Sequence, residues 1–137
     1  MPIIAEELAI GQEIAPIVKE MTIERMSRPL MAGSNPIHYD ATFAAHAGLP
    51  APIATGVMSS AFLSEMLTKA FGVDWIRSGS IDVKFIRPIY AGDTVTARGR
   101  ITDKCETSTG VRIALQIWCE TQRGESVTVG TASVVVH

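Results

Sequence analysis

The sequence predicts an α+β protein in which a curved antiparallel sheet wraps around one long central helix. The hydrophobic pattern has a helical period over residues 54–71 and changes to a period of two after residue 80. Short turn sequences separate the later segments, and such turns join antiparallel neighbours. Only the helix over 54–71 is long and apolar enough to cover the buried face of a sheet.

The composition suits a single domain over residues 1–137 and argues against several classes of protein. Of the 137 residues, 47% are hydrophobic, which is enough for a buried core without disulfide bonds. The formal net charge is −2 and no basic cluster occurs, so we expect no nucleic-acid partner. Cys105, Cys119 and the three histidines lack the spacing of a metal site, so we expect no metal and no cofactor. Cys119 lies on the apolar side of a strand pattern, which predicts a buried thiol.

Neither the N-terminus nor the longest apolar stretch indicates export or membrane insertion. The start is acidic at Glu6 and Glu7 and lacks the positive region of a signal peptide. The apolar stretch over 53–71 contains Glu65 and Lys69, which makes it too polar for a membrane span. We therefore expect a cytoplasmic protein with no membrane partner.

The first half of the chain predicts one strand and two short helices. The strand is expected around residues 13–19. A helix follows over 22–34, with Thr22 as its N-cap and with Pro29 interrupting or restarting it. A second small helix over 40–47 is expected to be capped by the carboxylate of Asp40.

The second half predicts the central helix followed by a four-stranded meander. Gly72 is placed to end the helix over 54–71. The strand segments alternate apolar and polar residues, and they cover residues 81–86, 95–100, 111–120 and 127–135. The turns between them are expected at 91–93, 108–110 and 122–124. A sheet curved around a central helix is the arrangement called the hotdog fold.

His38 and Gly56 are the residues whose positions suggest chemistry. His38 lies in a loop between two helical segments, and its imidazole can exchange protons near neutral pH. The alternative role of His38 is a hydrogen bond within the loop and no chemistry. Gly56 lies at the start of the central helix, where free backbone N–H groups can stabilise a developing negative charge. Its alternative role is tight packing of the helix against the sheet.

Two motifs and their spacing are more specific than either residue alone. The first is Asn-Pro-Ile-His-Tyr-Asp at 35–40, followed by Pro-Ile-Ala-Thr-Gly at 52–56 and the long apolar helix. The second is Val-Lys-Phe-Ile-Arg-Pro-Ile-Tyr-Ala-Gly-Asp at 83–93. Together they resemble the MaoC-like family of (R)-specific enoyl-CoA hydratases and 3-hydroxyacyl-thioester dehydratases. The resemblance covers roughly residues 30–137, and it implies a hotdog fold and a lyase.

The resemblance implies that His38 is the acid/base group, but one member of the family's catalytic pair is missing. In such enzymes an aspartate and a histidine share one water, commonly in the pattern Gly-Asp-x-Asn-Pro-x-His. Here the equivalent place is Gly33 or Ser34, and neither has a carboxylate. The expected catalytic residues are therefore His38, with Ser34, Asn35 or Asp40 positioning the water. Asp40 is favoured as a helix cap instead.

The resemblance also implies where the substrate binds. Gly56 matches the family's amide donor to the thioester carbonyl, and Thr55 stands where the family often has a histidine. Ser64, eight residues after Gly56, matches a polar position that lines the pocket in some members. Thr55, Gly56 and Ser64 are therefore the expected substrate-binding residues.

Three functions follow from these departures. The first is an active hydratase or dehydratase with an altered catalytic pair. The second is a non-catalytic acyl-CoA-binding subunit of a heteromeric dehydratase, whose partner supplies the missing carboxylate. The third is a hotdog acyl-CoA thioesterase, for which Glu65 on the central helix is the candidate acid, although a solvated or interface carboxylate is favoured there.

The expected partners follow from the same resemblance. The substrate is an acyl chain on coenzyme A or acyl carrier protein, which places the protein in fatty acid metabolism. Exposed sheet edges and an outward-facing Trp118 favour pairing of subunits. We expect a homodimer or a higher homo-oligomer, or alternatively pairing with a different hotdog chain.

Overall fold

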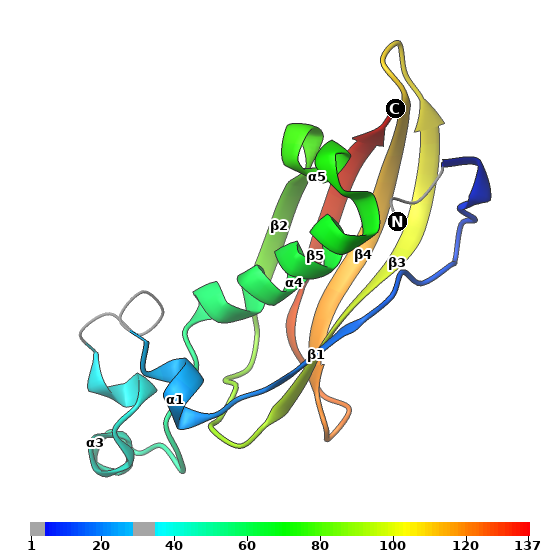
Figure 1. Cartoon of the computed structure of the whole chain (residues 1–137). Helices are drawn as coiled ribbons and strands as arrows, with labels where there is room; N and C mark the ends of the chain where they lie inside the picture. Colours follow the sequence, from blue (N-terminus) through cyan, green and yellow to red (C-terminus); the bar gives the residue numbers. More distant parts are fainter. Residues whose placement is uncertain (1–4, 29–34) are drawn as a thin grey trace.

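One antiparallel sheet and one long helix are the main elements of the protein. The structure is a computed structural model that describes residues 5–28 and 35–137. The strands are β1 (Ile17–Glu20), β2 (Ser80–Phe85), β3 (Thr94–Glu106), β4 (Val111–Thr121) and β5 (Ser126–Val136), in the sheet order β1-β3-β4-β5-β2. Helix α4 (Gly56–Phe71) lies against one face of this sheet (Figure 1). The predicted α+β hotdog fold is confirmed.

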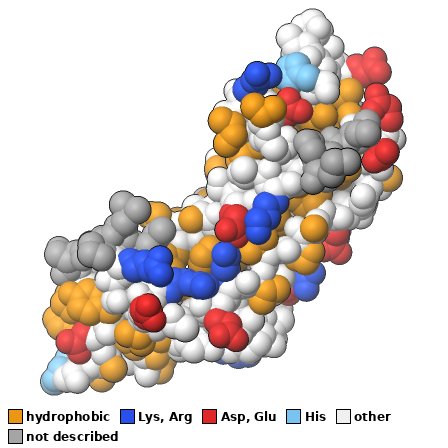
Figure 2. All heavy atoms as spheres, viewed as in Figure 1, with side chains coloured by type: hydrophobic (Ala, Val, Ile, Leu, Met, Phe, Trp, Pro, Cys, Tyr) orange, Lys and Arg blue, Asp and Glu red, His pale blue; other side chains and the backbone are white. Residues whose placement is uncertain are grey.

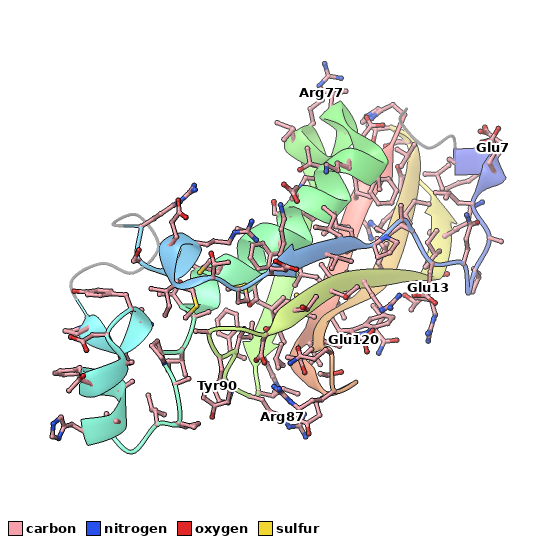
Figure 3. All side chains as sticks on the ribbon, turned by 60° about the horizontal axis from the view of Figure 1, so that its bottom comes forward. Glu7, Glu13, Arg77, Arg87, Tyr90 and Glu120 are labelled. Atoms are coloured by element: carbon pink, nitrogen blue, oxygen red, sulfur yellow. The ribbon has the colours of Figure 1, made fainter. Side chains whose placement is uncertain are left out.

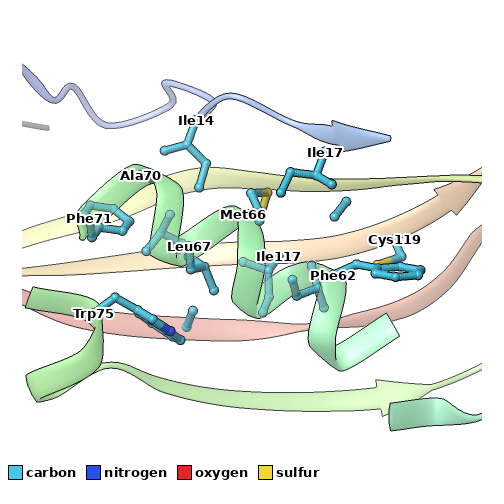
Figure 4. Packing of buried hydrophobic residues seen from close by; sticks show 14 of the residues in the cluster. Ile14, Ile17, Phe62, Met66, Leu67, Ala70, Phe71, Trp75, Ile117 and Cys119 are labelled. Atoms are coloured by element: carbon cyan, nitrogen blue, oxygen red, sulfur yellow. The ribbon is translucent and has the colours of Figure 1, made fainter. Parts of the chain in front are cut away.

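The apolar stripe of α4 packs onto the sheet and forms the core. Phe62, Met66 and Leu67 are buried on this helix and face Ile117 and Cys119 of β4 (Figure 4). Cys119 is 0% exposed, as the strand pattern predicted, and its burial raises the pKa of the thiol to about 12.

The short helices begin at the predicted caps. Thr22 accepts a hydrogen bond from the amide of Arg25 and opens α1 (Ile23–Met26). The Oδ1 atom of Asp40 accepts from the amides of Thr42 and Phe43, at 2.9 and 3.1 Å, and opens α3 (Ala41–His46). Figure 1 shows α1 and α3 together, near the N-terminal end of α4. Pro29 lies outside the described residues.

The predicted four-stranded meander is wrong for β2. Strands β3, β4 and β5 form the meander, but β2 pairs with β5 at the far edge of the sheet. The Ala91-Gly92-Asp93 turn therefore does not close a hairpin between β2 and β3. Instead, residues 86–91 run past the start of α4, where the Ala54 amide donates to Ile89 O and the Ala91 amide to Pro52 O.

Two other elements differ from the prediction. The strand expected over 13–19 is reduced to β1 and an isolated bridge between Glu13 and Arg100. Gly72 ends α4 as predicted, with a φ of 61° that favours glycine. A further helix, α5 (Val73–Ser78), then starts at once and buries Trp75 against the core.

No described helix combines the length and the apolarity that crossing a membrane requires.

Candidate active site

The N-terminus of α4 opens into a pocket of about 260 Å³. Three parts of the chain meet there: the start of α4, the segment that follows β2, and the beginning of β5. The lining residues are Ala54, Thr55, Gly56, Ser59, Phe85, Ile86, Arg87, Pro88, Ile89 and Thr128. Figure 3 shows Arg87 and Tyr90 on the segment between β2 and β3 that forms one wall.

Gly56 is the first residue of α4, and the ring of Phe85 packs directly over it. A Cβ atom at this position would lie 2.7 Å from Phe85 Cε2 and 2.9 Å from Cζ, well inside van der Waals contact. The glycine therefore has a packing role. The same position also leaves the first amides of α4 without partners inside the helix, at the edge of the pocket. Both roles considered for Gly56 remain compatible with the structure.

Thr55 is the N-cap residue of α4, yet its side chain makes no capping hydrogen bond. Its Oγ1 atom is buried and has no hydrogen-bond partner among the described residues. A buried hydroxyl without a partner is costly, and such a group often indicates a ligand or a water. Thr55 and Gly56 both line the pocket, so the buried hydroxyl of Thr55 lies beside the first amides of α4.

Two buried hydroxyl groups form the floor of the pocket. Ser59 and Thr128 are each 1% exposed. Thr128 Oγ1 donates to Ser59 Oγ at 2.9 Å, and Ser59 Oγ donates to Gly56 O at 3.1 Å. The sequence did not single out Thr128. The register between β4 and β5 shifts at Cys119/Glu120, and both Val127 and Thr128 are buried beside this irregularity.

His38 lies at the end of a short 3₁₀ turn, Pro36–His38, with its ring half-buried. Its Nδ1 atom is 2.8 Å from Ile53 O, and the Ile53 amide donates to Ile37 O at 3.0 Å. Because a carbonyl only accepts, Nδ1 carries the hydrogen, and Nε2 of the neutral ring is left as a base. The loop is thus tied to the residues just before Gly56, although His38 is not among the residues that line the pocket.

The remaining predicted residues are dispersed. Asn35 Oδ1 accepts from the amide of Ile37 at 3.2 Å and caps the 3₁₀ turn. Asp40 caps α3, as favoured from the sequence. Ser64 is half-buried on α4 outside the pocket lining, and its carbonyl accepts from the hydroxyl of Thr68 at 2.7 Å. Ser34 lies outside the described residues, as does Gly33.

Glu65, the candidate thioesterase acid, is paired with a lysine. Lys19 Nζ of β1 lies 3.1 Å from Glu65 Oε2 and 3.3 Å from Oε1. Both side chains are partly exposed, at 27% for Lys19 and 38% for Glu65. Glu65 therefore forms an ion pair between α4 and β1, away from the pocket at Gly56.

Asp93 holds the turn that follows the pocket wall. Asp93 is 4% exposed, and its carboxylate accepts from both terminal guanidinium nitrogens of Arg123, from Gln122 and from the Tyr90 amide. Burial alone would raise the pKa of Asp93, but the hydrogen bonds and the Arg123 charge outweigh it and hold the pKa below 3.8. The turn at Ala91-Gly92-Asp93 is therefore held in place by these hydrogen bonds.

Fold and site together define a hotdog domain that presents the N-terminus of a buried helix to a pocket. The family model described as MaoC like domain matches residues 19–131. The chain therefore belongs to the MaoC-like family of hydratases and dehydratases.

Several solved structures share this fold. An (R)-hydratase from A. caviae involved in PHA biosynthesis is 25% identical, with a TM-score of 0.80 over 97% of this chain and 100% of that one. The R-hydratase PhaJ1 from Pseudomonas aeruginosa is 22% identical, with a TM-score of 0.81 over 96% of this chain and 83% of that one. A chain of the ChsH1-ChsH2 complex from Mycobacterium tuberculosis is 18% identical, with a TM-score of 0.76 over 94% and 98%.

Proposed function

We propose that this chain is an enoyl-thioester hydratase and 3-hydroxyacyl-thioester dehydratase that uses His38 as its acid/base group. One observation carries the proposal: Nδ1 of His38 donates to Ile53 O at 2.8 Å, which fixes the ring and leaves Nε2 as a base. Ile53 precedes the Thr55-Gly56 helix start by only two residues. Family membership and the pocket at Gly56 support the same function.

In the proposed hydration, His38 Nε2 takes a proton from a water molecule while the water oxygen attacks C3 of the enoyl thioester. Negative charge then develops on the thioester carbonyl, which the Gly56 amide and the Thr55 hydroxyl stabilise. The protonated His38 returns the proton to C2, so that one water is added in total. Dehydration is the same sequence in reverse.

The other predicted residues have supporting roles in this proposal. The Oδ1 atom of Asn35 is used by the Ile37 amide, which leaves its NH₂ group to hold the attacking water. Ser34 contributes to the same water, and Ser64 lies farther along α4, toward the acyl chain. The substrate is an acyl-CoA or an acyl carrier protein thioester, because both present the same thioester group.

The second candidate is a non-catalytic acyl-binding subunit. The sequence has Gly33 and Ser34 where the family's aspartate is expected, and the Oδ1 atom of Asp40 is already occupied as a cap. Losing one member of a catalytic pair usually removes most of the rate. One similar structure is a complex of two proteins, ChsH1 and ChsH2. In this case a partner chain supplies the carboxylate.

Either function involves pairing of subunits, and we propose a homodimer as the basic form. Apolar side chains are exposed at the end of the molecule that carries α1 and α3, including Ile23, Tyr39 and Phe43 (Figure 2). Phe85 is 56% exposed on β2, an edge strand of the sheet. Such a surface favours association. Light scattering that gives only monomer at micromolar concentration would contradict this proposal.

Loss of the enoyl absorbance of crotonyl-CoA tests the function. The purified chain is expected to remove that absorbance without releasing free thiol, and His38→Gln is expected to slow the reaction by at least about 10²-fold. His46→Gln is the matched control, because His46 is an exposed histidine on α3 outside the Gly56 pocket. Thiol release from butyryl-CoA would instead identify a thioesterase. Tight acyl-CoA binding without turnover would favour the non-catalytic subunit.

A further inference from the structure

The hydroxyl pair on the pocket floor has a fixed direction of hydrogen bonding. Gly56 O can only accept, so the Ser59 hydrogen points to it. Ser59 therefore receives the hydrogen of Thr128 Oγ1. Both hydroxyl hydrogens are used, and the oxygen of Thr128 retains free lone pairs.

Thr128 is 1% exposed and still lines the pocket, so its oxygen is an acceptor held away from bulk water. The hydrogen bonds through Ser59 place this oxygen within about 6 Å of Gly56 O. The Gly56 amide and the Thr55 hydroxyl, which has no hydrogen-bond partner among the described residues, are donors on residues that line the same pocket. The pocket therefore has both donors and an acceptor among its lining residues.

We infer that Thr128 is a positioning residue whose Oγ1 accepts a hydrogen bond from an N–H or O–H group close to the thioester carbonyl of the substrate. This inference rests on the proposed function, because it assumes that the carbonyl lies at Gly56. Ser59 acts through Thr128: by accepting its hydrogen, it leaves the Thr128 oxygen as an acceptor only.

Two groups on the substrate are N–H or O–H donors only a few bonds from the thioester carbonyl. One is the hydroxyl on the third carbon of a 3-hydroxyacyl chain. The other is the first amide N–H of the carrier arm, whose nitrogen is the third atom beyond the sulfur. An enoyl or saturated acyl chain lacks the first group and retains the second, so a comparison of ligands separates the two sources.

Equilibrium dialysis against (R)-3-hydroxybutyryl-CoA and butyryl-CoA tests the inference on Thr128→Val, with Thr128→Ser as the control that keeps the hydroxyl. We expect valine to weaken binding about tenfold and serine to stay within twofold of the unaltered protein. A loss confined to the hydroxyacyl ligand assigns the 3-hydroxyl. An equal loss for both ligands assigns the carrier amide. Binding of both ligands within twofold in Thr128→Val overturns the inference.

A second variant separates hydrogen bonding from packing. Val127→Ala removes buried apolar packing next to Thr128, at a residue that does not line the pocket, so we expect ligand binding within twofold of the unaltered protein. Binding in Val127→Ala that is as weak as in Thr128→Val would overturn the inference in favour of a packing role.

A test on the ligand covers the case in which Thr128→Val does not fold. In the unaltered protein, either butyryl-CoA or an analogue of the hydroxyacyl ligand with an ester oxygen in place of the carrier amide N–H is expected to bind about tenfold more weakly than (R)-3-hydroxybutyryl-CoA. Equal binding of all three ligands would overturn the inference. These measurements need no turnover, so they can succeed or fail independently of crotonyl-CoA hydration.

Discussion

Replacing Gly56 by alanine, alone and together with Phe85→Ala, separates the packing role of this glycine from its role in binding. In Gly56→Ala the new Cβ would lie 2.7 Å from Phe85 Cε2, and ordinary contact begins at 3.4 Å. The ring must therefore move by about 0.7 Å, and such overpacking costs about 1–3 kcal/mol. Phe85 is 56% exposed and can move, so we expect the lower end, about 1 kcal/mol. Thermal unfolding should then shift down by about 3 °C.

The double variant removes the clash and leaves the methyl group at the helix start. Phe85→Ala alone is expected to cost about 1 kcal/mol, since less than half of the ring is buried. In Gly56→Ala/Phe85→Ala the melting temperature is expected to match that of Phe85→Ala, because no ring remains to clash. Hydration of crotonyl-CoA, however, is expected to stay about 10²-fold below that of Phe85→Ala, because the methyl group keeps the carbonyl from the amide.

Comparison of the two single variants with the double variant therefore separates stability from activity. Calorimetry measures the melting temperature, and the enoyl absorbance measures hydration. If the double variant regains the activity of Phe85→Ala, the glycine serves packing alone, and the reasoning that places the carbonyl at this amide is refuted.

Three further predictions concern single groups. His38→Gln is expected to lower kcat by about 10²–10⁴ with an unchanged circular dichroism spectrum, and a loss below tenfold would exclude it as the acid/base group. Asp93→Asn is expected to lower the free energy of unfolding at pH 7 by about 1–3 kcal/mol, because its part-buried hydrogen bonds to Arg123 lose the carboxylate charge. The pKa of Asp93 is held below 3.8, so the stability that its carboxylate contributes is present above about pH 4 and is lost as the pH falls through the lower pKa of the folded state. The free energy of unfolding, measured with urea across this pH range, should therefore depend less on pH in Asp93→Asn than in the unaltered protein. The same pH dependence in both proteins would contradict the assignment. Iodoacetamide is expected to modify the exposed Cys105 and to leave Cys119 unmodified in the folded protein, because burial raises the pKa of the Cys119 thiol to about 12. Two adducts per folded chain in the mass spectrum would contradict this prediction.

Much of the fold was predictable from interactions between residues close in the sequence. The period of 3.6 over 54–71 specifies α4 because its apolar stripe has to be buried. Thr22 and Asp40 predict helix starts because their side chains satisfy free amides within three residues. The burial of Cys119 follows from the alternation of apolar and polar residues along β4.

The place of β2 in the sheet depended on pairing between distant residues. At Gly130 of β5, a Cβ would lie 2.0 Å from Asp82 O of β2, so this glycine is required where the two strands approach. The sequence shows a glycine within a strand but not which strand approaches it. The short turn at 91–93 therefore suggested a local hairpin that does not form.

The candidate site was predictable only in part. The His38 loop and Gly56 stand out because each has a distinct chemical character and a motif around it. Thr128 could not be found from sequence, since its partner Ser59 is 69 residues away and a register shift lies beside it. Likewise, only the packing around α4 shows that the Thr55 hydroxyl has no hydrogen-bond partner within residues 5–28 and 35–137.

The most direct measurement is a crystal structure of the protein with (R)-3-hydroxybutyryl-CoA bound. We predict the thioester carbonyl oxygen within about 2.7–3.2 Å of the Gly56 amide nitrogen, with Nε2 of His38 within hydrogen-bond reach of the 3-hydroxyl or of a water beside it. A thioester bound elsewhere, or at Gly56 with His38 turned away from C2 and C3, would contradict the account.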